Sequence, residues 1–507
     1  MSQWLNVVGR LSSVLNDINV SSTADSEALT KIYRRWSGNS APVSVDAYID
    51  AVLNDVVAHA SNVSSPRCLA HMSAPTPAFV RLISEIVVSL NQNLGKREAS
   101  RAATLLERET LAQLHELVYR KPRSVYELQL TDLESSIGVI TSGGTVSNIT
   151  ALWCARNRAL GPRSGFSGIE SEGLHSALAC YGYNGCRIIV SQRHHYSMQK
   201  AADLLGLGTN AIQSVPVDAD GAMRPGALDA TLKACDEAGI LVLAIVGTAG
   251  TTDSGSIDPL EEIAAIAEQR NIHFHVDAAW GGPLLYSNCH RDKLRGIERA
   301  HTVTLDAHKQ LYMPIGCSLL LFRDTSIGNC IRKTANYMLR NGSGDLGRIS
   351  LEGSRPAVSM LLHAGLRIIS PEGYGWLIDK NIENTARFAA VVSEEYLNLE
   401  LLQTPQTNIL LYRFVPNGIT ASSSFADQYA LNRLNETIQR IQSKRGKSLV
   451  SLTQLRDLPC YEGCPVTAMR AVLNNFKTTE DDLRAVLEDQ LEIAAEILSG
   501  EGIESCR

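Results

Sequence analysis

The chain has 507 residues, of which 44% are hydrophobic and 20% charged, and its formal net charge is −6. This length allows two or three domains with a substantial core. The negative charge and the lack of a Lys/Arg-rich stripe argue against nucleic acid as a partner. No apolar run reaches the roughly eighteen residues of a membrane span, and residues 1–13 lack the order of a signal peptide. We therefore expect a cytoplasmic protein.

The cysteine pattern agrees with that compartment. Eleven cysteines are scattered along the chain without a Cys-x-x-Cys motif, and the nearest two, Cys460 and Cys464, are spaced four apart. We expect reduced thiols, and neither a zinc site nor a disulfide framework.

The N-terminal region has helical periodicity over residues 1 to about 60, with polar breaks, and predicts a helical segment. Such a segment cannot bury its apolar face alone, so we expect it to pack on the main body or on a second subunit. A turn-rich loop from Cys68 to Pro77 precedes a predicted helix over 78–90. His71 in this loop is a candidate to line a site, although an ordinary connector is the more common outcome.

A strand, a glycine turn and a helix are predicted in the stretch IGVITSGGTVSNITALW, which follows a helix over 100–119. Gly144 and Thr145 stand where this helix begins, and its free amides and dipole would attract a phosphate group. The Gly-Lys-Ser ending of a P-loop is missing. Taken alone, Gly-Gly-Thr at a helix start is a weak signal.

Two further strands end in polar residues. Residues 187–197 read RIIVSQRHHYS and place His195 in a loop, where its ring could stack on an aromatic cofactor or simply face solvent. The apolar strand 241–246 leads to Thr248 in a Gly/Thr loop before the next helix. Both positions would lie at the carboxyl edge of a parallel sheet, where open α/β sheets bind their ligands.

The stretch from His273 to Pro314 carries the strongest chemical signal. Its first strand ends at Asp277, and a second strand, over 302–305, is followed by the residues DAHK. A carboxylate at one strand end and Lys309 at another suit pyridoxal phosphate, whose pyridine nitrogen needs an anionic partner and whose aldehyde needs an amine. His273 and His275 could begin a metal site, but we interpret both as core histidines.

The rest of the chain completes an α/β protein. Strands and helices alternate through residue 322, which predicts a mainly parallel sheet with helices on both faces. Residues 335–347 are rich in glycine and predict a flap that carries Tyr337. Helices over 355–397 and a mixed tail predict a small C-terminal α+β domain. We divide the chain into an N-terminal helical segment (1–99), a large cofactor-binding domain (100–375) and a small domain (376–507).

Six motifs together resemble the group II pyridoxal-phosphate-dependent amino acid decarboxylases. They are SGGTVSN, RHHYS, GTAGTTDSGSIDP, HVDAAWGG, DAHKQLYMP and YMLRNGSGDLG. The resemblance covers roughly residues 65 to 480 and is greatest to the bacterial aspartate 1-decarboxylase branch. It implies a fold-type-I homodimer with active sites near the subunit interface. It also implies decarboxylation of an L-amino acid to an amine and CO2, with an acidic substrate, aspartate before glutamate.

The resemblance also implies catalytic roles by matching position. Lys309 would form the Schiff base with the cofactor and Asp277 would pair with the pyridinium nitrogen. His195 would stack on the ring as a base, and Tyr337 would return a proton to the product carbanion. One departure is His194, which stands where the family usually has a small residue.

The remaining cofactor contacts are implied in the same way. Gly144, Thr145 and His308 would hold the phosphate. Ala279 would pack on the second face of the ring, and Thr248 would lie beside it.

Substrate contacts are the least determined part of the predicted site. Arg355, in EGSRP, matches an arginine near the substrate end, and His71 is a further candidate. An acidic side chain needs a cation, which Arg355 or Arg340 could supply, although one of the two could bind the α-carboxylate instead.

Three alternative functions stay open at this point. The substrate could be an aromatic or another amino acid, or the chain could be a fold-type-I aminotransferase or lyase with the same cofactor. A catalytically silent relative that serves as a binding subunit is disfavoured, because Lys309, Asp277, His195 and Tyr337 are all retained.

Overall fold

A computed structural model describes residues 2–21, 23, 26–33, 42–335, 342–416, 424–456, 458, 461 and 463–500. The chain divides into two compact units. One contains Met1–Pro75 and Lys380–Arg507, and the other contains Thr76–Asp379. The N-terminal helices thus group with the C-terminal residues, whereas the sequence pattern suggested three consecutive parts.

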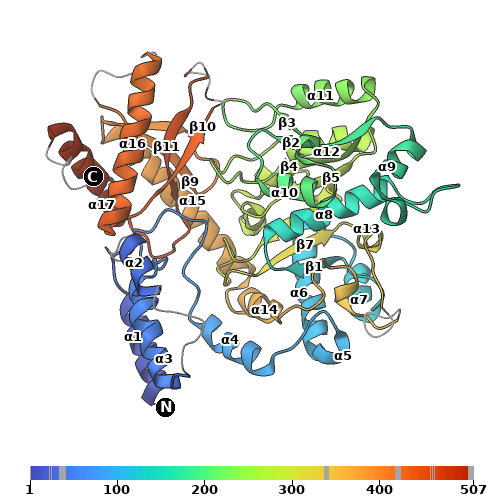
Figure 1. Ribbon diagram of the computed structural model, residues 1–507, viewed down its shortest axis with the longest axis horizontal. Helices are drawn as coiled ribbons and strands as arrows, with labels where there is room; N and C mark the ends of the chain where they lie inside the picture. The colour runs from blue at the N-terminus through green and yellow to red at the C-terminus, as the bar shows by residue number, and fades with distance from the viewer. Residues whose placement is uncertain are drawn as a thin grey trace. The chain divides into compact units, whose positions relative to one another are not determined.

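The unit Thr76–Asp379 is built on a seven-stranded sheet with the order β1-β7-β6-β5-β4-β2-β3 (Figure 1). Strands β2 to β6 run parallel, and only β7 is antiparallel to its neighbours β6 and β1. The carboxyl ends of β1, β2, β4, β5 and β6 therefore meet at one edge. The strands are β1 (Gly138–Thr141), β2 (Gly185–Ser191), β3 (Ile212–Val215), β4 (Ile240–Thr248), β5 (His273–Asp277), β6 (Thr302–Asp306) and β7 (Ser318–Phe322).

Helices cover both faces of this sheet. Successive strand residues point to opposite faces. Helix α8 (Gly144–Ala159) contacts the face that carries His275 and Asp277. Helix α12 (Leu260–Gln269) packs on the other face, where a Cβ at Gly247 would lie 2.9 Å from the Leu260 side chain. The predicted mainly parallel α/β architecture is confirmed.

The other helices of this unit connect the strands or flank the sheet (Figure 1). They are α4 (Phe79–Leu90), α5 (Arg97–Ser100), α6 (Ala102–Tyr119), α7 (Arg123–Thr131), α9 (Ile169–Tyr181), α10 (Ser197–Leu204), α11 (Pro225–Glu237), α13 (Thr325–Asn329), α14 (Ser359–Ile368) and α15 (Ser370–Glu394), the last of which continues into the other unit.

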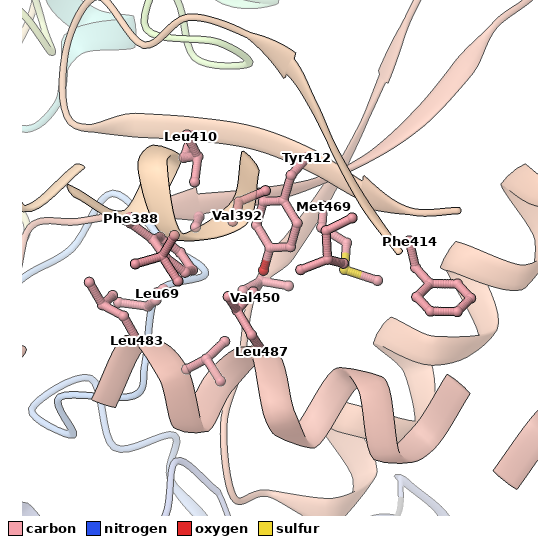
Figure 2. Packing of buried hydrophobic residues seen from close by; sticks show 14 of the residues in the cluster. Leu69, Phe388, Val392, Leu410, Tyr412, Phe414, Val450, Met469, Leu483 and Leu487 are labelled. Carbon is pink, nitrogen blue, oxygen red and sulfur yellow. The ribbon is translucent and has the colours of Figure 1, made fainter. Parts of the chain in front are cut away.

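The second unit contains a four-stranded antiparallel sheet with the order β10-β11-β9-β8. Its core gathers apolar side chains from the sheet, from α17 and from the end of α15 (Figure 2). The fully buried Tyr412 donates a hydrogen bond from its hydroxyl to Gln490 at 2.9 Å. This bond compensates for the burial of the polar hydroxyl in an apolar core. The elements are α1 (Ser2–Leu15), α2 (Ser26–Tyr33), α3 (Val45–Asp55), β8 (Leu399–Gln403), β9 (Ile409–Phe414), α16 (Phe425–Arg445), β10 (Ser451–Leu455), β11 (Val466–Val472) and α17 (Glu480–Ser499).

Several predicted elements agree closely with the observed ones. The helix predicted over 78–90 is α4, and the strand predicted over 409–414 is β9. The N-terminal region is helical where it is described, and the C-terminal tail mixes strands and helices as expected. No helix among the described residues is long and apolar enough to cross a membrane.

Candidate active site

A cleft of about 310 Å³ opens at the carboxyl edge of the seven-stranded sheet. It lies beside the ends of β1, β2, β4, β5 and β6, because parallel strands direct the residues that follow them to one edge. The cleft brings together eight of the predicted site residues: Gly144, Thr145, His195, Thr248, Asp277, Ala279, His308 and Lys309.

Asp277 is the last residue of β5 and is held by two hydrogen bonds. Its Oδ2 accepts a bond from the Asn148 side-chain amide at 2.8 Å, and its Oδ1 accepts one from the Ala279 main-chain N–H at 3.2 Å. Its side chain is buried. A fixed, buried carboxylate that lines the cleft is suited to pair with a cationic ring nitrogen.

Lys309 lies in the turn after β6, and its Nζ is 3.0 Å from Oδ2 of Asp306. His308 Nε2 is 3.6 Å from the same oxygen. The other oxygen of Asp306 is buried and has no hydrogen-bond partner among the described residues. Sequence reasoning gave Asp306 no role, although it stands three residues before the lysine.

His195 follows β2, and among the described residues its ring is hydrogen-bonded through Nδ1 alone. Its Nδ1 lies 2.8 Å from the Ser197 hydroxyl and accepts a longer contact, 3.3 Å, from the Ser197 main-chain N–H. Burial lowers the pKa of His195, and the nearby Asp277 carboxylate partly offsets this shift. The neighbouring His194 directs its Nδ1 to the Ser191 carbonyl at 2.9 Å and does not line the cleft. The unusual residue at 194 therefore leaves the placement of His195 intact.

The first turn of α8 forms another wall of the cleft. Gly143 caps the helix without a side-chain hydrogen bond, so the first amides of the helix are left for a ligand. A glycine at position 144 leaves room for the Asp306 side chain, because a Cβ would lie 2.8 Å from both of its carboxylate oxygens and would force that side chain to shift. Thr248, on the opposite side, has its main-chain N–H bonded to Asp258 at 2.7 Å, which fixes the loop after β4.

Arg355 does not line the cleft. Its guanidinium is buried and pairs with the Glu107 carboxylate at 2.9 Å. It also donates to the main-chain carbonyls of Ile140 at 3.0 Å and Leu94 at 3.4 Å. The structure thus gives this arginine three partners within the protein, and its predicted contact with substrate stays a prediction.

Three further site residues were predicted, namely His71, Tyr337 and Arg340. His71 belongs to the unit that contains residues 1–75 and is exposed at its surface, and partial desolvation of the ring and the nearby Arg470 lower its pKa. Tyr337 and Arg340 lie outside the described residues.

His273 and His275 are buried, as expected for core histidines. Each contacts the Thr302 hydroxyl at 2.9 Å, and burial lowers the pKa of His275 to about 4. His275 also contacts a residue that lines the cleft, because its Nε2 lies 3.0 Å from the Asn148 side-chain carbonyl oxygen. Among the described residues no group of three or more His, Cys, Asp or Glu side chains could hold a metal ion.

Asn148 and Ser197 are functional candidates that sequence reasoning missed. Asn148 donates to both Asp277 and Ser197, and Ser197 in turn contacts His195. A signal was present, since Asn148 stands one helical turn after Gly144 and so shares its face of α8.

The residues of the cleft fit pyridoxal phosphate by their donor set. The amine of Lys309 and the carboxylate of Asp277 line one cavity. The uncapped α8 amides and His308 are suited to a phosphate group. His195 and the small Ala279 could lie against the two faces of a planar ring. Each group that the cofactor requires is therefore present in the cleft.

Comparison with known proteins gives a consistent result. The pyridoxal-dependent decarboxylase conserved domain matches residues 39–414. An aspartate 1-decarboxylase from Aliivibrio fischeri is 41% identical over 93% of this chain and 88% of the relative. An L-2,4-diaminobutyrate decarboxylase from Rhizobium meliloti is 36% identical over 74% of this chain and 69% of the relative.

A solved structure shares the fold. It is the glutamate decarboxylase domain of diaminobutyrate-pyruvate transaminase and L-2,4-diaminobutyrate decarboxylase from Vibrio parahaemolyticus. It is 26% identical, with a TM-score of 0.81, and the match covers 97% of this chain and 96% of that chain.

Proposed function

Because the chain belongs to the pyridoxal-dependent decarboxylase family, and is thus a decarboxylase of amino acids, we propose that its substrate is acidic, aspartate before glutamate. The observation that carries this proposal is the 41% identity to the Aliivibrio fischeri aspartate 1-decarboxylase over 93% of the chain. The expected products from aspartate are β-alanine and CO2.

We assign the cofactor contacts to the residues that line the cleft. Lys309 would hold the aldehyde carbon, and Asp277 would accept a hydrogen bond from the protonated ring nitrogen. The α8 amides and His308 hold the phosphate. When bound, pyridoxal phosphate supplies an electron sink for the pair left behind by CO2. The carboxylate of Asp277, fixed by Asn148, would maintain the positive charge that makes this sink effective.

The return of a proton to Cα needs an acid inside the site. We assign this step to Tyr337, on the strength of the flap motif YMLRNGSGDLG. A phenol that is delivered when the segment covers the cleft can donate a proton away from bulk water.

The side-chain carboxylate of an acidic substrate needs a cation. Arg355 is already paired with Glu107, so Arg340 is the better candidate of the two predicted arginines. A bidentate contact from a guanidinium would also discriminate against apolar side chains.

A second candidate substrate is L-2,4-diaminobutyrate. The observation that favours it is the 36% identity to the relative from Rhizobium meliloti.

A substrate panel tests both candidates. Purified enzyme with added cofactor would be assayed for CO2 and amine with aspartate, glutamate, 2,4-diaminobutyrate, tyrosine and tryptophan, and Lys309→Ala would serve as the inactive control. We expect the highest kcat/KM with aspartate. A higher value with diaminobutyrate would replace the first candidate by the second, and preference for an aromatic amino acid would exclude both.

We also propose that the enzyme is a homodimer with the active site near the subunit interface. Helix α4 exposes the apolar side chains of Leu82, Ile86, Val88 and Leu90. Ile315, at the rim of the cleft, is 82% exposed. Several exposed apolar side chains on one helix are typical of a surface that binds a partner. Light scattering should give twice the mass of the chain, and a monomer that retains full activity would contradict this proposal.

A further inference from the structure

A continuous series of hydrogen bonds runs behind the cleft from Thr302 through His275, Asn148 and Ser197 to His195. We infer that this series holds neutral His195 with its proton on Nε2, so that the ring presents a hydrogen-bond donor to the substrate. Asn148 and Ser197 are then positioning residues. The inference deepens the proposed function and rests on it only for the identity of the substrate.

Asp277 determines which group is the donor in each hydrogen bond of this series, because it fixes the orientation of the Asn148 amide. An ionised carboxylate only accepts hydrogen bonds. The group of Asn148 that lies 2.8 Å from it must therefore be the NH2 and not the carbonyl oxygen. Amide orientations are assigned from such networks, and here the buried carboxylate decides the assignment. The second N–H of the same amide then points to the Ser197 hydroxyl at 3.0 Å.

His275 supports the same orientation from the other side. Because the NH2 group of Asn148 donates to Asp277 and Ser197, its oxygen is the atom that faces His275 Nε2 at 3.0 Å. A hydrogen bond between them requires a proton on that nitrogen. Burial lowers the pKa of His275 to about 4, so at neutral pH this ring carries one proton only. Its Nδ1 is then bare and accepts from the Thr302 hydroxyl at 2.9 Å, and the 3.2 Å approach of this nitrogen to the Thr302 main-chain carbonyl involves no hydrogen bond in this tautomer.

Ser197 donates hydrogen bonds to His195. A main-chain N–H can only donate, and that of Ser197 points at His195 Nδ1 at 3.3 Å. The Ser197 hydroxyl already accepts from Asn148, and its own proton is left for the same nitrogen at 2.8 Å. Two donors thus converge on Nδ1, which has to be bare.

The proton of neutral His195 is therefore on Nε2. Among the described residues Nε2 has no hydrogen-bond partner, and the ring lines the cleft. A donor in this position can bind the carboxylate of an amino acid, and in its neutral form it cannot accept a proton there.

The test is a nitrogen NMR measurement on the full-length, cofactor-free chain labelled with 15N-histidine. The His195 signals would be assigned by their loss in His195→Gln. We expect a bare Nδ1 and a protonated Nε2 at neutral pH. A protonated Nδ1 in the parent protein would overturn the inference. Because this measurement needs neither cofactor nor substrate, it is independent of the substrate assignment.

Variants test the two positioning residues. Ser197→Ala removes one of the two donors to Nδ1, and Asn148→Leu removes the bond that directs the Ser197 hydroxyl. Loss of one neutral hydrogen bond should shift the tautomer ratio about fivefold toward Nδ1–H. The matched control is Asn157→Leu, a buried amide on the same helix that bonds to the Cys330 carbonyl. It should leave the His195 signals unchanged.

A functional measurement accompanies the spectra. In Ser197→Ala we expect KM for the substrate to rise while the affinity for pyridoxine 5′-phosphate, which lacks the aldehyde, stays within about twofold of the parent. If both variants keep the parental tautomer ratio, Asn148 and Ser197 are not positioning residues. An equal loss of substrate and pyridoxine phosphate affinity would indicate general damage to the site and would also overturn the assignment.

Discussion

Replacement of Arg355 by methionine distinguishes a structural from a substrate-binding role for this arginine. The guanidinium is buried, pairs with Glu107 at 2.9 Å and donates to the carbonyls of Ile140 and Leu94. It thereby connects β1, α6 and the segment before α5. Loss of one member of a buried ion pair leaves the other charge uncompensated and typically costs about 3–5 kcal/mol. We expect Arg355→Met to lower the free energy of unfolding by an amount in this range.

The second half of the experiment removes both charges. In Arg355→Met/Glu107→Met no buried charge is left uncompensated, so much of the lost stability should return. Urea unfolding of the cofactor-free proteins, with Arg387→Met as a surface ion-pair control, provides the measurement. If Arg355→Met unfolds at the parental urea concentration while KM for the substrate rises, the guanidinium binds substrate and the structural assignment is wrong.

Four further predictions concern the cleft and its surroundings. Lys309→Ala should fold but lose activity and any borohydride-reducible cofactor link; turnover at the parental rate would refute the assignment of the lysine. Asp277→Asn should still bind cofactor but lower kcat by about two orders of magnitude, since a charge-assisted hydrogen bond contributes roughly 1.5–3 kcal/mol; near-normal kcat would make this residue structural. Tyr337→Phe should slow amine release more than CO2 release in single-turnover measurements, and equal rates would remove the tyrosine from the reaction. Burial lowers the pKa of His275 and of His301 from 6.5 to about 4 in the folded protein. As the pH falls, the unfolded chain therefore binds these protons before the folded one does, and the free energy of unfolding should fall by several kcal/mol between pH 6.5 and 4. A urea midpoint that does not change over this range would contradict the burial argument.

The edge of the sheet was predictable from local patterns. The buried run that ends at Asp277 and the strand before Lys309 identify two neighbouring strand ends, since both runs are short, apolar and followed by polar residues. The antiparallel strand β7 was not predicted, although a signal existed. Residues 307–317, which connect β6 to β7, are fewer than the dozen or more that a parallel crossover requires.

Residues that act through distant partners were harder to find. Asn148 bonds to a carboxylate 129 positions away. Its position one turn after Gly144 indicates which face of the helix it shares but does not identify this partner. Arg355 has the same property, because nothing in its motif indicated the ion pair with Glu107, 248 positions earlier. Local periodicity fixes where a strand ends, whereas the partner of a buried polar group depends on the packing of several elements.

The construction of the cleft from five strand ends has a consequence for how the protein folds. The walls come from segments as distant as Gly144 and Lys309, which become neighbours only when β1, β2, β4, β5 and β6 lie in one sheet. A cofactor that requires all of these walls binds the native state and not its precursors. A ligand that binds only the native state leaves the folding barrier unchanged and slows escape from the native state. Cofactor supply would thus determine how long a folded molecule lasts and not how fast it forms.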